Sequence, residues 1–362
     1  MPLISAGVIP ARKTSEGWKL LILRAYRNWD FPNDGRLTGW ENRPMSKPVC
    51  IVWMNEASVY ERALARAGLA DRFEVHGVRA DQAIPAELAA RCEVLLGWRP
   101  APGLLASMPR LRWIQSSTAG MDQWLASPGL RKDTLLTCAR GSHRVQMPEN
   151  ILAALFFLTK PLMQCALDQR DARWVRRISE PLAGKTLGIL GLGAIGRELA
   201  RKAHALELKV IGTKRSPAPI AHVAKVYSPE ATDEVLGTSD FVLLLLPSTA
   251  ETENFMDARR LRAMRRGAWL LNFARGALIV DADLVEAVRS KIIAGAVLDV
   301  FRKEPLPADH PFWKTEGIVV LPHIGGLHPA RDEGVAEVFI ANARRFLAGE
   351  PLETVVDRAR GY

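Results

Sequence analysis

Residues 186–203 read TLGILGLGAIGRELARKA and decide the fold of this chain. The first five are rich in apolar side chains, which is typical of a buried strand, and apolar residues recur at helical spacing from Ile195 to Ala203. Glycines in the pattern GxGxxG join the strand to the helix, which is the context that a dinucleotide-binding fingerprint requires. The first glycine allows a tight turn, the second lets the backbone approach a pyrophosphate, and the third lets the helix pack against the strand. A purely structural glycine turn is the alternative. The predicted cofactor contacts here are Gly191, Gly193, Ala194, Ile195 and Gly196.

Further strand-like runs lie on both sides of this stretch. Together with residues 186–190, five later runs give the six strands of a complete doubly wound dinucleotide domain: 208–213, 241–246, 268–273, 295–300 and 317–321. Earlier apolar runs alternate with helical patches such as 58–67, which predicts a second parallel sheet: 49–54, 73–78, 93–97, 111–115 and 134–138. A long helix is expected over 147–174 with a kink at Pro161, and an amphipathic helix over 329–349.

Composition limits the class of protein. A chain of 362 residues predicts two domains, and 48% hydrophobic with 24% charged residues is ordinary for a globular protein. The net charge of +10 comes from scattered residues, so it favours anionic small molecules over nucleic acid. The four cysteines lie far apart, which indicates free thiols and no metal site. No run approaches the roughly 18 apolar residues of a membrane span, and the N-terminus lacks a signal-peptide pattern, so we expect a cytoplasmic location.

The first 44 residues have a different character. The segment SAGVIPARKTSEGWKLLILRAYRNWDFPNDGRLTGWENRP resembles the opening of a Nudix hydrolase, but the glutamate-rich box that holds magnesium in that family does not follow. Met45 is followed by SKPVCIVWMNE, which resembles a fresh protein start with its own first strand. Our hypothesis is that residues 1–44 are an appended, loosely ordered and non-functional fragment.

The end of the second strand of the dinucleotide domain indicates the cofactor. An acid at this place binds the ribose 2′-hydroxyl of NAD, whereas a basic residue accommodates the 2′-phosphate of NADP. The chain has no acid here but two basic and two hydroxyl side chains, which predicts NADPH over NADH. A solvated basic turn is the alternative. The residues concerned are Thr213, Lys214, Arg215 and Ser216.

Three later segments, each directly after a strand, carry the groups that reduction of a 2-oxo acid needs. They are LLNFARGALIVD with Arg275, GAVLDVFRKEPLP with Glu304, and VVLPHIGG with His323. An arginine binds a carboxylate at two points and polarises the carbonyl, and a histidine supplies the proton. A carboxylate paired with that histidine favours its protonated form and fixes the ring. Each residue alone also has a structural explanation, as a surface arginine, a solvated glutamate or a loop histidine.

Together these motifs resemble the D-isomer-specific 2-hydroxyacid dehydrogenase family, and within it the glyoxylate/hydroxypyruvate reductases. The resemblance runs from about residue 48 to residue 362 and includes LRWIQSSTAGMD, QMPEN, GLGAIGRELA, LPSTAETENF and LPHIGG. It implies a Rossmann domain inserted into a flavodoxin-like substrate domain. The implied boundaries are 48–146 with 323–362 for the substrate domain and 147–322 for the dinucleotide-binding domain, and the helix from Pro148 implies a homodimer.

The resemblance also assigns site residues. Arg275, Glu304 and His323 correspond to the catalytic arginine, glutamate and histidine. The implied cofactor contacts are Leu246, Pro247, Phe273 and Asp299, the aspartate receiving the nicotinamide carboxamide. The implied substrate contacts are Arg275, the loop residues Ala119 and Gly120, and the nearby Trp98 and Arg99. Two other functions stay open: a nucleotide-sensing, corepressor-like binding protein without significant turnover, and, more weakly, a bifunctional protein with a working Nudix unit.

Overall fold

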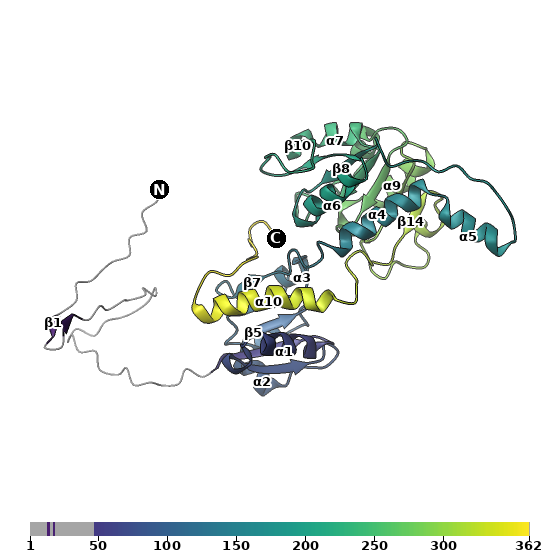
Figure 1. The fold of residues 1–362 in the computed structure, drawn as a ribbon. Helices are drawn as coiled ribbons and strands as arrows, with labels where there is room; N and C mark the ends of the chain where they lie inside the picture. Colours follow the sequence, from purple (N-terminus) through teal and green to yellow (C-terminus); the bar gives the residue numbers. More distant parts are fainter. Residues whose placement is uncertain (1–12, 15–16, 19–46, 362) are drawn as a thin grey trace. The chain divides into compact units, whose positions relative to one another are not determined.

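A computed structural model describes residues 13–14, 17–18 and 47–361. The chain divides into two compact units, Met1–Ser46 and Lys47–Tyr362. In the first unit, β1 (Lys13–Thr14) pairs antiparallel with β2 (Gly17–Trp18). The rest of the Nudix-like segment lies outside the described residues. The second unit contains two parallel sheets (Figure 1).

The first sheet has five parallel strands in the order β4-β3-β5-β6-β7, the flavodoxin-like order 2-1-3-4-5. Its strands are β3 (Val49–Trp53), β4 (Glu74–Val78), β5 (Cys92–Gly97), β6 (Trp113–Ser116) and β7 (Leu135–Thr137). Alternate side chains of β3 enter two different core clusters, one with Cys50 and Val52, the other with Ile51 and Trp53. Both faces of the sheet are therefore covered, as parallel sheets require.

Helices from both ends of the unit cover the first sheet. They are α1 (Ala57–Arg66), α2 (Ala86–Arg91), α3 (Asp122–Leu125) and α10 (Arg331–Ala348), with short 3₁₀ turns at Ala70–Arg72 and Leu105–Ser107. Figure 1 shows α10 beside this sheet, and Phe339 of α10 stacks on Trp113 of β6 at 5.4 Å between ring centroids. The C-terminal helix, which the resemblance assigned to the substrate domain, thus packs on the first sheet.

The second sheet has seven parallel strands in the order β10-β9-β8-β11-β12-β13-β14. This is the doubly wound order 3-2-1-4-5-6 with one more strand at its edge. Its strands are β8 (Thr186–Leu190), β9 (Lys209–Thr213), β10 (Lys225–Tyr227), β11 (Phe241–Leu244), β12 (Trp269–Asn272), β13 (Gly295–Leu298) and β14 (Ile318–Val320). The expectation of six strands was wrong by one, because β10 was missed. The fold class itself is confirmed.

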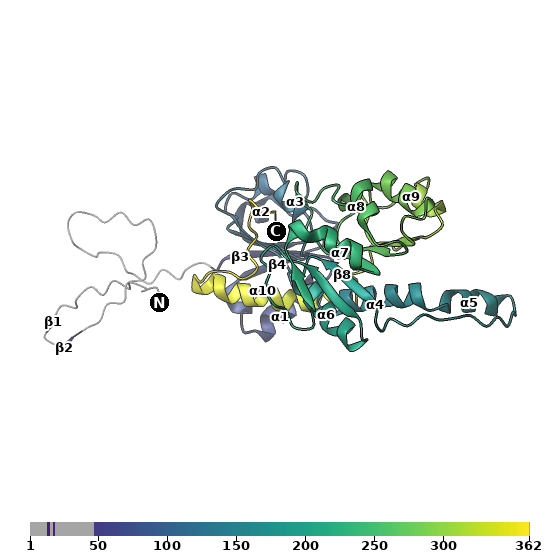
Figure 2. The ribbon, with the colours of Figure 1, turned by 90° about the horizontal axis from the view of Figure 1, so that it is seen from above.

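Helices pack on the two faces of this sheet, except α5, which extends away from it (Figure 2). They are α4 (Gln146–Thr159), α5 (Leu162–Arg170), α6 (Ala194–Ala205), α7 (Thr232–Thr238), α8 (Ala258–Ala263) and α9 (Asp281–Arg289), with 3₁₀ turns at Pro229–Ala231, Gly276–Leu278 and Pro311–Lys314. The helical stretch expected over 147–174 is broken at Pro161, as expected, into α4 and α5, which are bent by 65° because Pro161 interrupts the helical hydrogen bonds, but it ends at Arg170. In the described part of the chain, no single helix is long and apolar enough to cross a membrane, although this bent pair passes that test of length and composition together.

Candidate active site

The glycine turn after β8 has the shape that a phosphate group needs. Gly191 has a φ of +109°, and a Cβ there would lie 2.7 Å from the Leu245 carbonyl oxygen. A Cβ at Gly196 would lie 2.8 Å from the Gly191 carbonyl oxygen, so only glycine lets α6 approach the turn this closely. A Cβ at Gly193 would meet nothing within 4 Å, and both Gly193 and Ala194 are exposed. The turn therefore presents open backbone at the N-terminus of α6, a favourable place for an anion.

The basic turn after β9 is ordered by the strand that the sequence did not reveal. The Lys214 amide donates to the Tyr227 carbonyl of β10 at 2.9 Å. Thr213 is buried, while Arg215 and Ser216 are exposed. Arg215 Nη2 lies 3.3 Å from Oε2 of Glu251, which comes from the loop after β11. An acid thus does stand beside this turn, although it comes from a distant part of the sequence.

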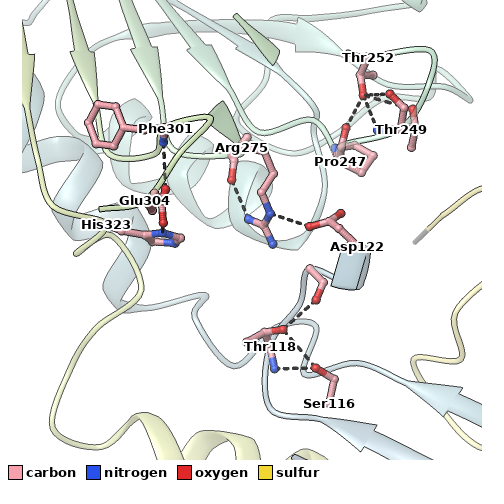
Figure 3. Close-up of polar contacts among 12 residues, drawn as sticks. Ser116, Thr118, Asp122, Pro247, Thr249, Thr252, Arg275, Phe301, Glu304 and His323 are labelled. Carbon is pink, nitrogen blue, oxygen red and sulfur yellow. Dashed lines mark hydrogen bonds and ion pairs between the residues drawn. The ribbon is translucent and has the colours of Figure 1, made fainter. Parts of the chain in front are cut away.

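The loop after β11 is held in one conformation by Thr252. Its hydroxyl donates to the Pro247 carbonyl at 2.6 Å and accepts from the Thr249 amide at 2.8 Å (Figure 3). Leu246 and Pro247 are partly buried at the start of this loop, and Phe273 after β12 is buried. The structure therefore gives this segment a fixed path directly after the sheet, where ligands bind in open α/β folds.

His323 and Glu304 form a pair. His323 Nδ1 lies 2.7 Å from Glu304 Oε2, and Glu304 Oε1 accepts from the Phe301 amide at 2.9 Å (Figure 3). With Nδ1 engaged, Nε2 is the ring nitrogen left for another partner. His323 has a φ of +52°, an uncommon conformation for a residue with a side chain, and such strained positions cluster at functional sites.

The loop that carries His323 is fixed by two side chains whose anchoring role the sequence did not reveal. The oxygens of Asp299, a fully buried residue, accept from the amides of Ile324 at 2.7 Å and Gly325 at 2.9 Å. Burial raises the pKa of this carboxyl, and the two amide donors oppose the shift. Asn150 of α4 donates to the Ile324 and Gly325 carbonyls at 3.1 and 3.0 Å. Asp299 was expected to receive a nicotinamide carboxamide, and in this structure its carboxylate anchors the loop.

Arg275 joins the two sheets. Its Nε donates to Asp122 Oδ2 at 2.9 Å, and its Nη1 donates to the Ala274 carbonyl at 2.7 Å (Figure 3). A Cβ on Gly120 would lie 1.4 Å from Arg275 Nη2, so the guanidinium rests directly on the backbone of the loop after β6. The structure thus brings together the arginine and the loop that were assigned separately to the substrate carboxylate. Asp122 was not foreseen.

Hydrogen bonds of Thr118 hold the loop after β6 in place. Thr118 Oγ1 donates to the Gly120 carbonyl at 2.8 Å and lies 3.1 Å from Ser116 Oγ (Figure 3). Ala119, next to it, is exposed. Trp98 and Arg99 follow the neighbouring strand β5, with the Arg99 guanidinium 4.8 Å from the Trp98 ring centroid. Both side chains are exposed and contact each other. They are not among the contacts of Arg275 described above, and neither is buried in a core.

Comparisons with known proteins identify the family of this chain. Residues 152–325 match the model of the D-isomer specific 2-hydroxyacid dehydrogenase, NAD binding domain. Glyoxylate/hydroxypyruvate reductase A of Serratia proteamaculans is 32% identical over 305 residues, which cover 82% of this chain and 95% of that protein. The chain belongs to the D-isomer-specific 2-hydroxyacid dehydrogenases. The resemblance seen in the sequence is thereby confirmed for the family, whereas the family match does not reach the Nudix-like segment, for which no support was found.

Solved structures extend the likeness to the whole fold of this dehydrogenase. A family member from Aeromonas salmonicida has a TM-score of 0.78 and 34% identity, covering 86% of this chain and 100% of that one. The NADPH-dependent glyoxylate/hydroxypyruvate reductase of Sinorhizobium meliloti, solved with NADP and sulfate, has a TM-score of 0.76 and 30% identity, covering 87% and 100%. The chain is thus an oxidoreductase with a Rossmann domain for a nicotinamide cofactor. Among the described residues, no three side chains of metal-ligating type are grouped together.

Proposed function

We propose that this dehydrogenase reduces small 2-oxo acids such as glyoxylate and hydroxypyruvate to 2-hydroxy acids, with NADPH as the reductant. The observation that carries the proposal is the contact between Arg275 and the Gly120 backbone, at the same site as the His323–Glu304 pair. In the view of Figure 3, Arg275 lies between that pair and Asp122. A carboxylate bound to Arg275 would therefore have amide donors on one side and an acid–base pair on the other.

Each catalytic residue has a distinct part in the proposed reaction. Bound NADPH supplies a hydride to the carbonyl carbon. Arg275 holds the carboxylate and polarises the carbonyl, while the backbone of Ala119 and Gly120 helps to orient the acid. His323 gives the proton on Nε2 to the carbonyl oxygen, and Glu304 keeps the ring in place through Nδ1. Carbon thus gains the hydride and oxygen the proton, which gives the 2-hydroxy acid and NADP⁺.

The residues present fit an NADP cofactor. Open backbone at Gly193 and the N-terminus of α6 suit the pyrophosphate. Lys214 and Arg215, with the hydroxyls of Thr213 and Ser216, would hold the 2′-phosphate, which would replace the exposed Glu251 carboxylate that pairs with Arg215 in this structure. The Sinorhizobium meliloti relative with bound NADP supports this preference. Leu246, Pro247, Phe273 and Asp299 remain the proposed contacts of the nicotinamide half.

The arm from α5 to about residue 181 supports the proposed homodimer. Figure 2 shows α5 extending away from the second sheet. Its large apolar side chains are exposed, with Trp174 at 93% and Ile178 at 94%. Exposed apolar surface of this kind marks an interaction site, and a second copy of the chain is the proposed partner.

The two sheets support the proposed domain boundaries, 48–146 with 323–362 for the substrate domain and 147–322 for the cofactor domain. A cytoplasmic location is also part of the proposal, because the Cys50 and Cys92 thiols are buried and free.

The test is consumption of NADPH with glyoxylate and with hydroxypyruvate. We expect turnover in the wild type and a loss of about 10²- to 10⁴-fold in kcat for His323→Ala, with a comparable loss of kcat/KM for Arg275→Ala. Arg79→Ala removes an exposed arginine that pairs with Asp81 and should leave both constants unchanged. If the purified wild type binds NADPH but oxidises none with either acid, the proposal is wrong and the corepressor-like alternative gains support.

A further inference from the structure

Asp122 is an acid that binds the arginine of the proposed carboxylate site. It is the first residue of α3 and follows the loop that ends at Gly120. Its Oδ2 accepts from Arg275 Nε at 2.9 Å, and the pair joins residues 153 positions apart (Figure 3). Both side chains are partly exposed, at 41% for Asp122 and 36% for Arg275. A fixed negative charge therefore lies beside a site that must bind an anion.

The three edges of the Arg275 guanidinium have different partners. Nε is bound to Asp122 and Nη1 to the Ala274 carbonyl, whereas Nη2 lies against the Gly120 backbone. A substrate carboxylate that uses Nη2 and the loop amides would thus share one guanidinium with Asp122. From ordinary hydrogen-bond lengths, the Asp122 carboxylate and the substrate carboxylate on Arg275 would lie roughly 6 Å apart.

This inference rests on the proposed function and concerns the choice of substrate. We propose that Asp122 selects 2-oxo acids that carry a single negative charge, by repelling a second anionic group on the substrate. Arg275 compensates one carboxylate, whereas a second carboxylate next to the carbonyl adds a negative charge that Asp122 repels, and the attraction of a protonated His323 for that charge is the same in every variant. A second carboxylate at a comparable separation from Asp122, in a partly solvated site, would change the relative affinity by about three- to ten-fold.

The test compares two substrates that differ by one carboxylate. Glyoxylate has one, and mesoxalate carries a second in place of the aldehyde hydrogen. Asp122→Asn removes the charge and keeps an oxygen that accepts from Arg275 Nε, so the arginine stays oriented. We expect the ratio of kcat/KM for mesoxalate to that for glyoxylate, with saturating NADPH, to rise about three- to ten-fold. Hydration of the two acids is a property of the solution and cancels between variants.

A matched control removes a similar charge elsewhere. Asp81 binds the Nε of Arg79 at 3.0 Å on the exposed surface, so Asp81→Asn makes the same chemical change outside the site. It should leave the ratio unchanged. Asp122→Ala removes both charge and acceptor, and it should lower kcat for glyoxylate well below that of Asp122→Asn. This difference separates the positioning of Arg275 from the effect of charge.

Binding separates failure of this inference from failure of the proposed function. The dissociation constants of glycolate and of tartronate, which adds a second carboxylate, are measured by calorimetry on the NADP-loaded protein. Asp122→Asn should favour tartronate over glycolate by the same factor, whether or not the wild type turns over. Absent turnover with a shifted binding ratio would refute only the proposed function. Unchanged ratios in Asp122→Asn, in turnover and in binding, would overturn the role of Asp122.

Discussion

Substitution of Gly120 by alanine should disable the site without disturbing the fold. The new Cβ would lie 1.4 Å from Arg275 Nη2 and 2.6 Å from Cζ, whereas heavy atoms in contact need about 3.5 Å. The guanidinium must therefore withdraw by roughly 2 Å, which breaks the 2.9 Å bond to Asp122 and removes Nη2 from the loop. Gly120 has no left-handed φ, so the backbone itself accepts alanine.

The size of the effect follows from the bonds that are lost. A hydrogen bond to a charged group contributes about 1.5 to 3 kcal/mol, so kcat/KM for glyoxylate should fall by about 10- to 150-fold. Steady-state kinetics at saturating NADPH measures this change, and the dissociation constant of NADPH should stay as in the wild type. Gly237→Ala is the control, because its Cβ makes an ordinary 3.6 Å contact with the Ala263 carbonyl. A kcat/KM for Gly120→Ala within a few-fold of wild type, in a protein of unchanged melting temperature, would refute the reasoning.

Three further predictions concern other parts of the chain. Replacing Lys214 and Arg215 by alanine should raise KM for NADPH by about 10- to 100-fold while KM for NADH changes little; equal effects on both cofactors would contradict the 2′-phosphate site. Asp168→Asn should weaken dimerisation, measured by analytical ultracentrifugation, because Asp168 binds Arg177 at 2.7 Å and Arg173 at 3.0 Å within the exposed arm. Since Arg177 and Arg173 lower the pKa of Asp168, this contribution is complete above the ordinary aspartate pKa of about 3.9 and is lost as the pH falls through the lowered pKa; dimers that dissociate already at pH 5 would argue against it. A chain that starts at Met45 should fold and reduce glyoxylate at the full-length rate, and loss of folding or activity would refute the hypothesis that residues 1–44 are dispensable.

The sequence revealed those parts of the fold that have local patterns. Strands with four or five consecutive buried residues, such as β3 and β8, were placed nearly to the residue. β10 (Lys225–Tyr227) was missed because it has three residues at a sheet edge with partly exposed side chains, too few for a period to show. The helix expected to reach residue 174 ends at Arg170, and Arg173 and Arg177 fold back to Asp168.

For the candidate site, the sequence revealed residues that directly follow strands. Arg275, Glu304 and His323 follow β12, β13 and β14, and parallel strands end at one edge of their sheet. Asp122 and Asn150 were missed because they act on partners 153 and 174 residues away, and no local pattern marks such contacts. Asp122 stood inside a motif that carried the family resemblance, but only the fold shows that it binds Arg275.

The central claim is that Arg275, the Gly120 backbone and His323 act on one bound 2-oxo acid. A crystal structure of the protein with NADP⁺ and oxamate, an unreactive analogue of glyoxylate, tests this claim most directly. The oxamate carboxylate should be bound by the Arg275 guanidinium and the Gly120 amide, and its carbonyl oxygen should lie within hydrogen-bond distance of His323 Nε2. Oxamate bound away from Arg275, or a His323 ring that faces away from the carbonyl oxygen with Glu304 still on Nδ1, would contradict the account.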